Sequence, residues 1–173
     1  MHTERVANLL GATALAVTDL ALTDATEAGG VSTSGAAAIV VLSASSAGLS
    51  VTELGKRVGL SQSAAARMVD SLEAKRMVAR RTGPGRSVSV DLTPAGRRTG
   101  RALLAARAAP LNGAVAVLDE DEQETLAALL AKLLTGLYGE IGSAELLCRM
   151  CDRASCVRDA TCPVGQAERD RGH

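Results

Sequence analysis

The spacing of apolar residues predicts a mostly helical chain. Over residues 3–22 apolar positions recur every three or four residues, which is typical of an amphipathic helix. The Gly29-Gly30 pair ends this pattern, and residues 34–45 are apolar on most of their helical surface, so we expect them in the core. After Asp119, closely spaced leucines predict a long last helix with a wide apolar stripe.

Between these segments the pattern changes to two short helices joined by a glycine turn. Ser50 is followed three residues later by Glu53, which predicts a capping box at the start of the first short helix. This helix should end at Gly59, and Ser61 should cap a second helix that runs to about Arg76. Two short helices around a glycine turn indicate a helix-turn-helix unit.

The second short helix separates its side chains by face. One side is apolar and is expected to face inward, whereas the other carries short polar groups and an arginine. Such a surface suits the major groove of DNA, where polar groups reach phosphates and base edges and arginine recognises guanine. The alternative is an ordinary solvated helix face. The residues expected to contact DNA from this helix are Ser61, Gln62, Ser63 and Arg67.

Two alternating apolar stretches then flank a Gly/Pro-rich turn at residues 82–86. We therefore expect strands over residues 77–81 and 87–92 that form a β-hairpin. A basic hairpin beside a helix-turn-helix is a wing, whose arginines can enter the narrow minor groove. The wing residues expected to contact DNA are Arg80, Arg81 and Arg86. A further helix should begin after Thr93, and Pro110 is expected to kink or interrupt it.

The charges of the chain are segregated, although its formal net charge is zero. Residues 51–107 hold twelve Lys and Arg against four Asp and Glu, whereas residues 118–146 hold seven acidic residues against one Lys. A basic middle section indicates that this part of the molecule faces a polyanion. A set of solvated helix faces is the alternative.

Composition limits the class of protein. Of 173 residues 47% are hydrophobic, but Tyr138 is the one aromatic residue, so the core must be built from Ala, Leu and Val. No apolar run approaches the roughly 20 residues of a membrane span, and the N-terminus lacks the layout of a signal peptide. We therefore expect a cytoplasmic protein with no membrane partner. The chain carries no phosphate-binding loop, dinucleotide fingerprint or nucleophile–base pair, so we do not expect an enzyme.

The order helix, helix, helix-turn-helix, wing, long helix, long helix resembles the MarR family of bacterial regulators. The resemblance covers roughly residues 3–147 and is most specific over residues 54–72, around Arg86 and over residues 90–96. It implies a winged helix-turn-helix fold, mostly α with a small β-wing, that forms a homodimer through its N- and C-terminal helices. It also implies a recognition helix in the major groove and Arg86 in the minor groove. The acidic residue that usually precedes this arginine is replaced by Gly85.

Four cysteines follow within one short stretch, at the spacing C-x2-C-x4-C-x5-C. In a reducing cytoplasm such clustering favours metal binding or redox chemistry over structural disulfides. Four thiolates can hold an iron–sulfur cluster or a tetrahedral zinc ion. Zinc ribbons usually place two CxxC pairs well apart, whereas this compact loop resembles the cluster-binding tail of superoxide-sensing MerR-type regulators, whose middle spacing is shorter. The expected ligands are Cys148, Cys151, Cys156 and Cys162.

Together these features predict a sequence-specific DNA-binding repressor with two parts. Residues 1–147 form the MarR-like domain, with a DNA-binding core at about residues 50–93, and residues 148–173 form a cysteine-rich tail. We expect a homodimer on a palindromic operator, whose DNA affinity is controlled by a 2Fe–2S or 4Fe–4S cluster that senses redox, oxidative or nitrosative stress. One alternative is a structural zinc or thiol switch in a regulator with a small-molecule effector. Others are an electron carrier that uses the tail, and an architectural DNA binder without a switch.

Overall fold

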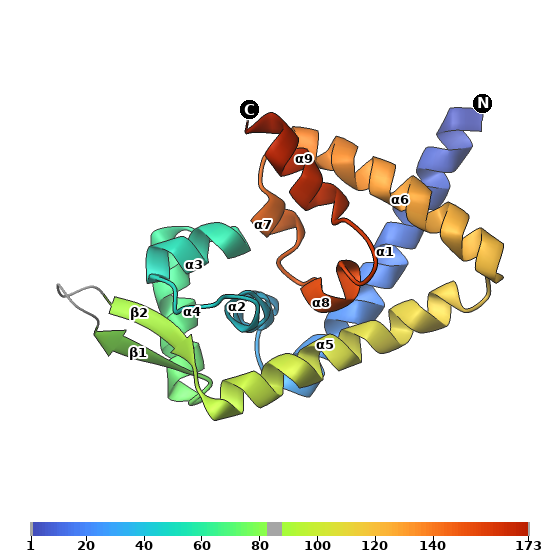
Figure 1. The fold of residues 1–173 in the computed structure, drawn as a ribbon. Coiled ribbons are helices and arrows are strands. Elements are labelled where there is room, and N and C mark those ends of the chain that lie inside the picture. The colour runs from blue at the N-terminus through green and yellow to red at the C-terminus, as the bar shows by residue number, and fades with distance from the viewer. Residues whose placement is uncertain (1, 83–87, 173) are drawn as a thin grey trace.

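Helices dominate the computed structural model, which describes residues 2–82 and 88–172. The helices and strands are α1 (His2–Gly29), α2 (Thr33–Ser43), α3 (Val51–Val58), α4 (Gln62–Ala74), β1 (Val78–Thr82), β2 (Val88–Leu92), α5 (Pro94–Val115), α6 (Glu120–Ile141), α7 (Ala144–Leu147), α8 (Arg153–Cys156) and α9 (Pro163–Arg171). Helix α1 crosses α5, the β-hairpin lies at one end of α5, and α6 turns back from its other end (Figure 1).

The element order predicted for the first 141 residues is confirmed. α1 ends at Gly29, and Asp119 caps α6 with a full capping box, because its carboxylate accepts from the Glu122 N–H at 2.9 Å and the Glu122 carboxylate accepts from the Asp119 N–H at 3.0 Å. The expectation that Pro110 interrupts the helix after the wing is wrong, since α5 continues to Val115. Packing of α1 and α2 along α5 outweighs the one backbone hydrogen bond that a proline removes.

The main core surrounds α2, the helix expected there because it is apolar on most of its surface. All residues from Gly35 to Leu42 are buried. Around them pack aliphatic side chains from α3, α4, the hairpin and α5, with no aromatic ring among them. Small and branched side chains allow the close packing that a core without aromatics requires. The largest fully buried side chains of this core are Ile39, Leu54, Val69, Leu72, Val78, Val90 and Leu103.

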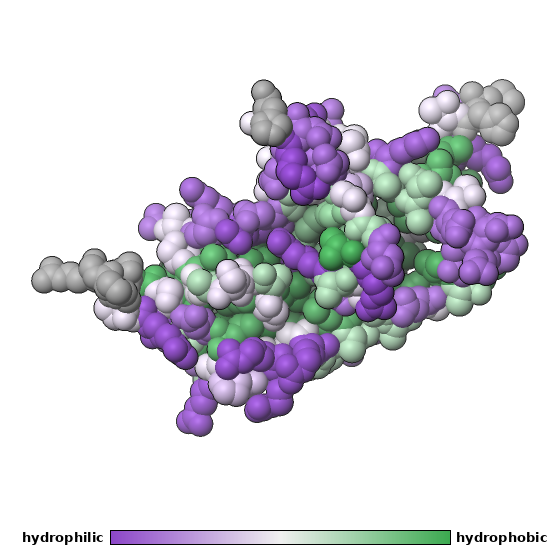
Figure 2. Space-filling view, viewed as in Figure 1, coloured by the Kyte–Doolittle hydropathy of each residue, from purple (hydrophilic) through white to green (hydrophobic). Residues whose placement is uncertain are grey.

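The two terminal long helices differ from this core, because their apolar faces lie open in the single chain. The uncovered residues of α1 are between 46% and 69% exposed, and those of α6 between 43% and 52%. Part of this apolar surface is visible in the half of the molecule that holds α1 and α6 (Figure 2). Rows of exposed leucines are unusual for a monomer and mark an interaction site. They are Val6, Leu9, Leu10, Leu15 and Leu20 on α1, and Leu129, Leu130, Leu133, Leu137 and Ile141 on α6.

The hydropathy of α1 also corrects an expectation from the sequence. Over Thr3–Gly29 this helix reaches a mean hydropathy of 1.5, so by length and composition it is apolar enough to cross a membrane. Alanines between its leucines raise the hydropathy, but polar residues interrupt them, so they do not form the unbroken apolar run sought in the sequence. In this fold α1 packs along α5, where Ala21 and Gly29 are buried.

Candidate DNA-binding surface and cysteine cavity

Two serine caps and a glycine build the helix-turn-helix from α3 and α4, as predicted. The Ser50 hydroxyl accepts from the Glu53 N–H at 3.1 Å, and the Ser61 hydroxyl accepts from the Ala64 N–H at 3.4 Å. Between the two helices Gly59 adopts φ 78°, in the left-handed region that favours glycine. These local features fix where each helix begins and ends, so that α4 is presented at a defined angle.

The close approach of α3 and α4 depends on a second glycine. A Cβ atom added at Gly55 would lie only 2.7 Å from the Cβ of Ala65, far inside normal contact distance. The backbone of the turn also bonds here, since the Leu60 N–H donates to the Gly55 carbonyl at 2.8 Å. A larger residue at position 55 would push α4 away from α3, so the glycine sets the spacing of the helix pair.

The outer face of α4 is polar and accessible, as the sequence predicted. Its inner face is buried against the main core through Ala65, Met68, Val69 and Leu72. The four residues expected to contact DNA from this helix are all exposed, namely Ser61, Gln62, Ser63 and Arg67. Their contacts to bases and phosphates stay predictions.

Arg80 on β1 ties the hairpin to α4. Its guanidinium pairs with Asp70 at 2.6 Å and also with Glu73, and its backbone N–H donates to the Glu73 carboxylate at 3.1 Å. The hydrogen bond to Asp70 and the pairing with Glu73 raise the pKa of Arg80 above its ordinary value. From the sequence Arg80 was expected only as a DNA contact, and this positioning role was not predicted. The acidic pair at i and i+3 on the outer face of the helix was the available signal.

The remainder of the proposed wing surface is described in part. β1 and β2 pair antiparallel from Val78 opposite Leu92 to Thr82 opposite Val88, and Arg81 is exposed on this hairpin. Arg86, at the expected tip, lies outside the described residues. Its contact with the minor groove therefore stays a prediction.

The four cysteines surround one cavity of about 260 Å³. The loops and caps of α7, α8 and α9 bring them together: Cys148 follows α7, Cys156 ends α8, and Cys162 caps α9 by accepting from the Gly165 N–H. Within the described part of the chain, no three His, Cys, Asp or Glu side chains already converge as closely as ligands of one metal ion. The thiols therefore line a space and do not meet at a point.

The CxxC pair of this cavity shares a proton. A hydrogen bond between the two thiols lowers the pKa of Cys151 to about 6 and raises the pKa of Cys148, and nearby Arg107 and Arg153 also favour the Cys151 thiolate. Burial raises the pKa of Cys156. One thiolate is therefore present near neutral pH, which is the form that binds metals and reacts as a nucleophile.

The cysteine region is fixed to the body of the protein by a small core of its own. Tyr138 of α6, Ala144 of α7 and two residues of α9, Val164 and Ala167, are buried together, and Cys148 and Cys162 pack against them. The Arg171 guanidinium lies 5.3 Å from the centroid of the Tyr138 ring. On the other side Met150 packs against the main core. The three helices after Gly142 were not predicted, although Cys162-Pro163 is a typical helix start.

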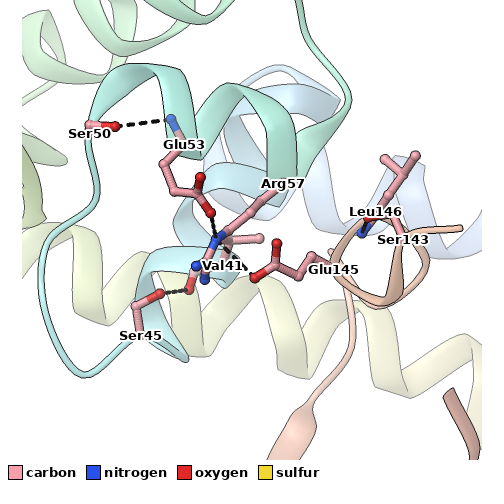
Figure 3. Close-up of polar contacts among 8 residues, drawn as sticks. All are labelled: Val41, Ser45, Ser50, Glu53, Arg57, Ser143, Glu145 and Leu146. Carbon is pink, nitrogen blue, oxygen red and sulfur yellow. Dashed lines mark hydrogen bonds and ion pairs between the residues drawn. The ribbon is translucent and has the colours of Figure 1, made fainter. Parts of the chain in front are cut away.

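α7 forms the direct bridge between the cysteine region and the helix-turn-helix (Figure 3). Arg57 Nε on α3 lies 2.8 Å from Glu53 Oε1 and 3.0 Å from Glu145 Oε1 on α7. The capping box predicted at Ser50 is therefore wrong in its second half, because the Glu53 carboxylate pairs with Arg57 and the serine alone caps the helix. Glu145 also lines the cysteine cavity. One residue therefore contacts both regions.

A second cavity, of about 350 Å³, lies between the end of α2, β2 and the start of α5. Its walls include Asp91, Arg97 and Arg101 together with several serines. Arg97 is already engaged, because its guanidinium donates to the Leu92 carbonyl at 2.7 Å. This cavity is a space that a small-molecule effector could occupy.

Comparison with known proteins finds a family match that covers the helix-turn-helix. The model of the MarR family matches residues 29–86, from the end of α1 into the wing. A MarR-family regulator from Silicibacter pomeroyi is 29% identical, with a TM-score of 0.53 over 69% of this chain and 84% of that one. The YusO protein from Bacillus subtilis is 26% identical, with a TM-score of 0.66 over 76% of this chain and 93% of that one.

The likeness extends to a structure that contains DNA. A mutant of MepR from S. aureus bound to an oligodeoxyribonucleotide is 20% identical, with a TM-score of 0.59 over 76% of this chain and 97% of that one. At this identity the likeness shows the fold alone. Among curated proteins no relative matches the chain.

The predicted fold class, a mostly α winged helix-turn-helix with a two-stranded wing, is confirmed by these structures. The relative from Silicibacter pomeroyi and MepR from S. aureus are both described as transcription regulators. The chain is therefore similar to MarR-family regulators in the sequence of its helix-turn-helix region and in its fold.

Proposed function

We propose that this chain is a homodimeric repressor that binds a palindromic operator in double-stranded DNA. The observation that carries the proposal is the exposed polar face of α4, which lies in the section of the chain richest in Lys and Arg. A helix with this surface, held by a helix-turn-helix, suits the major groove. The MepR mutant bound to an oligodeoxyribonucleotide has the same fold.

The second copy is proposed from the uncovered apolar faces of α1 and α6. A twofold dimer that joins these faces would bury them and would hold two α4 helices about one DNA turn apart. The hydropathy of α1 then serves helix packing, and we place the protein in the cytoplasm. Leu133→Glu should give monomers in analytical ultracentrifugation. Lys132→Glu changes the exposed residue just before it on α6 and should leave a dimer.

DNA fragments selected from a random pool by the wild-type protein test the docking mode. Arg67→Ala should weaken binding by about 1–3 kcal/mol if this side chain recognises a base. Arg86→Ala should weaken binding to all fragments and lower the salt slope by roughly one unit. Arg169→Ala removes the same charge from α9 and should bind as the wild type does. Unchanged affinity in both α4 and wing variants would contradict the assigned surface.

We also propose that the cysteine cavity holds an iron–sulfur cluster ligated by Cys148, Cys151, Cys156 and Cys162. The supporting observation is that all four thiols line one cavity of about 260 Å³. A single zinc ion needs four sulfur atoms at about 2.3 Å from one point, so these walls would have to close around it. A cluster of several iron and sulfur atoms occupies a wider space and needs less rearrangement.

The charges around the cavity fit an anionic group. Arg153 lines the cavity, and both Arg153 and Arg107 stabilise the Cys151 thiolate. A cysteine-ligated cluster carries negative charge, and neighbouring arginines offset it. Oxidation, nitrosylation or loss of the cluster would change the walls of the cavity, and we propose that this change alters the DNA affinity.

Protein purified without oxygen tests the cluster directly. We expect visible absorption that air bleaches, with iron and acid-labile sulfide in equal amounts, and loss of both in Cys151→Ser. Ser155→Ala, which also lies in the cysteine-rich tail, should retain them. A colourless protein with one zinc per chain and no iron would refute the cluster and leave the structural-zinc alternative.

A further inference from the structure

The short helix α7 stands between the cysteine cavity and the DNA-binding unit and contacts both. Ala144 and Glu145 line the cavity, and Cys148, the residue that ends α7, is a proposed ligand. The Cys148 N–H donates to the Ala144 carbonyl at 2.9 Å, so the ligand is held to the single turn of this helix. A shift of the Cys148 backbone would therefore be passed on to α7.

On its other side α7 reaches the turn of the helix-turn-helix. A Cβ atom added at Gly59 would lie 2.9 Å from Leu146 Cδ1, so the Leu146 side chain rests directly on the left-handed turn between α3 and α4. Two residues earlier, Arg57 is bound by Glu145 at 3.0 Å. The ion pair of Glu145 with Arg57, drawn in Figure 3, and the contact of Leu146 with Gly59 both lie at the C-terminal end of α3, which leads into the turn before α4.

We infer that the Glu145–Arg57 ion pair, together with Leu146 on Gly59, transmits the state of the cysteine cavity to the recognition helix of the same protomer. This inference rests on the proposed cluster. Pulling Cys148 toward a cluster shifts α7, and an anionic cluster beside the Glu145 carboxylate changes its attraction to Arg57. Either effect acts on the end of α3 within one chain, without requiring a change in the dimer angle.

The chain also contains a matched control for this ion pair. Glu168 on α9 lines the same cavity as Glu145. Glu168→Gln removes the same charge from the same cavity, whereas Glu145→Gln also removes the partner of Arg57. Any difference between the two variants is therefore due to the loss of the ion pair with Arg57 on α3 and not to the loss of negative charge in the cavity.

The experiment measures DNA affinity by fluorescence anisotropy for cluster-loaded and cluster-free dimers, with iron content and visible absorption recorded for each. Coupling between two sites commonly amounts to about 5–150-fold in affinity. We expect Glu168→Gln to keep the wild-type ratio of loaded to cluster-free affinity and Glu145→Gln to bring it close to one. Arg57→Gln removes the other partner of this ion pair and should also bring the affinity ratio close to one. The double variant Glu145→Arg with Arg57→Glu exchanges the two charges and should restore part of the ratio.

Hydrogen exchange provides a second readout that needs no DNA. Loading the cluster should change the exchange of backbone amides around Gly59 in the wild type and in Glu168→Gln, and should change it much less in Glu145→Gln. A Glu145→Gln protein that loads its cluster and keeps both the wild-type affinity ratio and the wild-type exchange would overturn the inference alone. Protein that holds zinc or no metal in this cavity would overturn the proposed cluster, and the inference with it.

Discussion

The winged helix-turn-helix region and the cysteine region are built on opposite principles within one chain. The first encloses aliphatic side chains such as Ile39, Leu54 and Leu103, each completely shielded from solvent. The second has four buried residues beside an open cavity walled by thiols. Side chains fill the interior of the first region, whereas the second region has a cavity at its centre. We therefore expect the first to fold by its own packing and the second to depend on what it binds.

The largest effect on stability is expected from a cavity in the main core. Leu72→Ala removes a side chain that is only 2% exposed, so the lost burial and the remaining void should lower the free energy of unfolding by about 2–5 kcal/mol. Urea unfolding followed by circular dichroism measures this loss. Val157→Ala in the cysteine region removes an exposed side chain and should change stability little; equal losses in the two variants would contradict the contrast.

Filling the cavity should affect the other region selectively. A cofactor present at 100 times its Kd stabilises the state that binds it by about 2.7 kcal/mol. Loading should therefore slow hydrogen exchange in α9 by the corresponding factor of about a hundred and leave α2 nearly unchanged. Equal protection of both helices would show that the two regions unfold together.

A smaller effect tests the caps of the DNA-binding unit. Ser61→Ala leaves the Ala64 N–H without its side-chain acceptor at the start of α4 and should cost about 1 kcal/mol of unfolding free energy. Thermal unfolding of the cluster-free protein measures it. Ser61→Asp keeps an acceptor at the cap and should retain wild-type stability while its added negative charge weakens DNA binding.

The smallest change is chemical and leaves the fold intact. Because the pKa of Cys151 is lowered to about 6, its thiolate forms as the pH rises through 6, and alkylation of the metal-free protein should level off above about pH 7. The pKa of Cys156 is raised, so its alkylation should still increase above pH 9. Mass spectrometry after brief iodoacetamide treatment separates the two sites. A common pH profile for both would contradict the shared proton of the CxxC pair.

The sequence could predict the features that short segments determine. Ser50, Ser61 and Asp119 mark helix starts by their own hydrogen bonds, and Gly59 marks the turn by its backbone conformation. The cysteine spacing likewise brought all four thiols to one cavity. Each of these features is formed by residues that lie close together in the sequence, so the sequence pattern was enough to predict it.

The features that depend on distant partners could not be predicted. α7 and α8 have four residues each, too short to be stable by helix propensity, and they form because they pack on other elements. The pairing of Arg57 with Glu145 joins residues 88 positions apart, and no local pattern selects one carboxylate from nineteen acidic residues. The clamp of Arg80 differs, because the acidic pair Asp70 and Glu73 on α4 was a signal in the sequence that had been overlooked.

The clamp of Arg80 on Asp70 and Glu73 has a consequence for the operators that this protein can accept. In the proposed complex with DNA, this clamp fixes the distance between α4, proposed for the major groove, and the hairpin, proposed for the minor groove. The length of the operator can then vary only between its two half-sites. Among operators selected from random DNA, the spacer that separates the two halves should vary, whereas the distance between the two contacted patches inside each half should stay fixed.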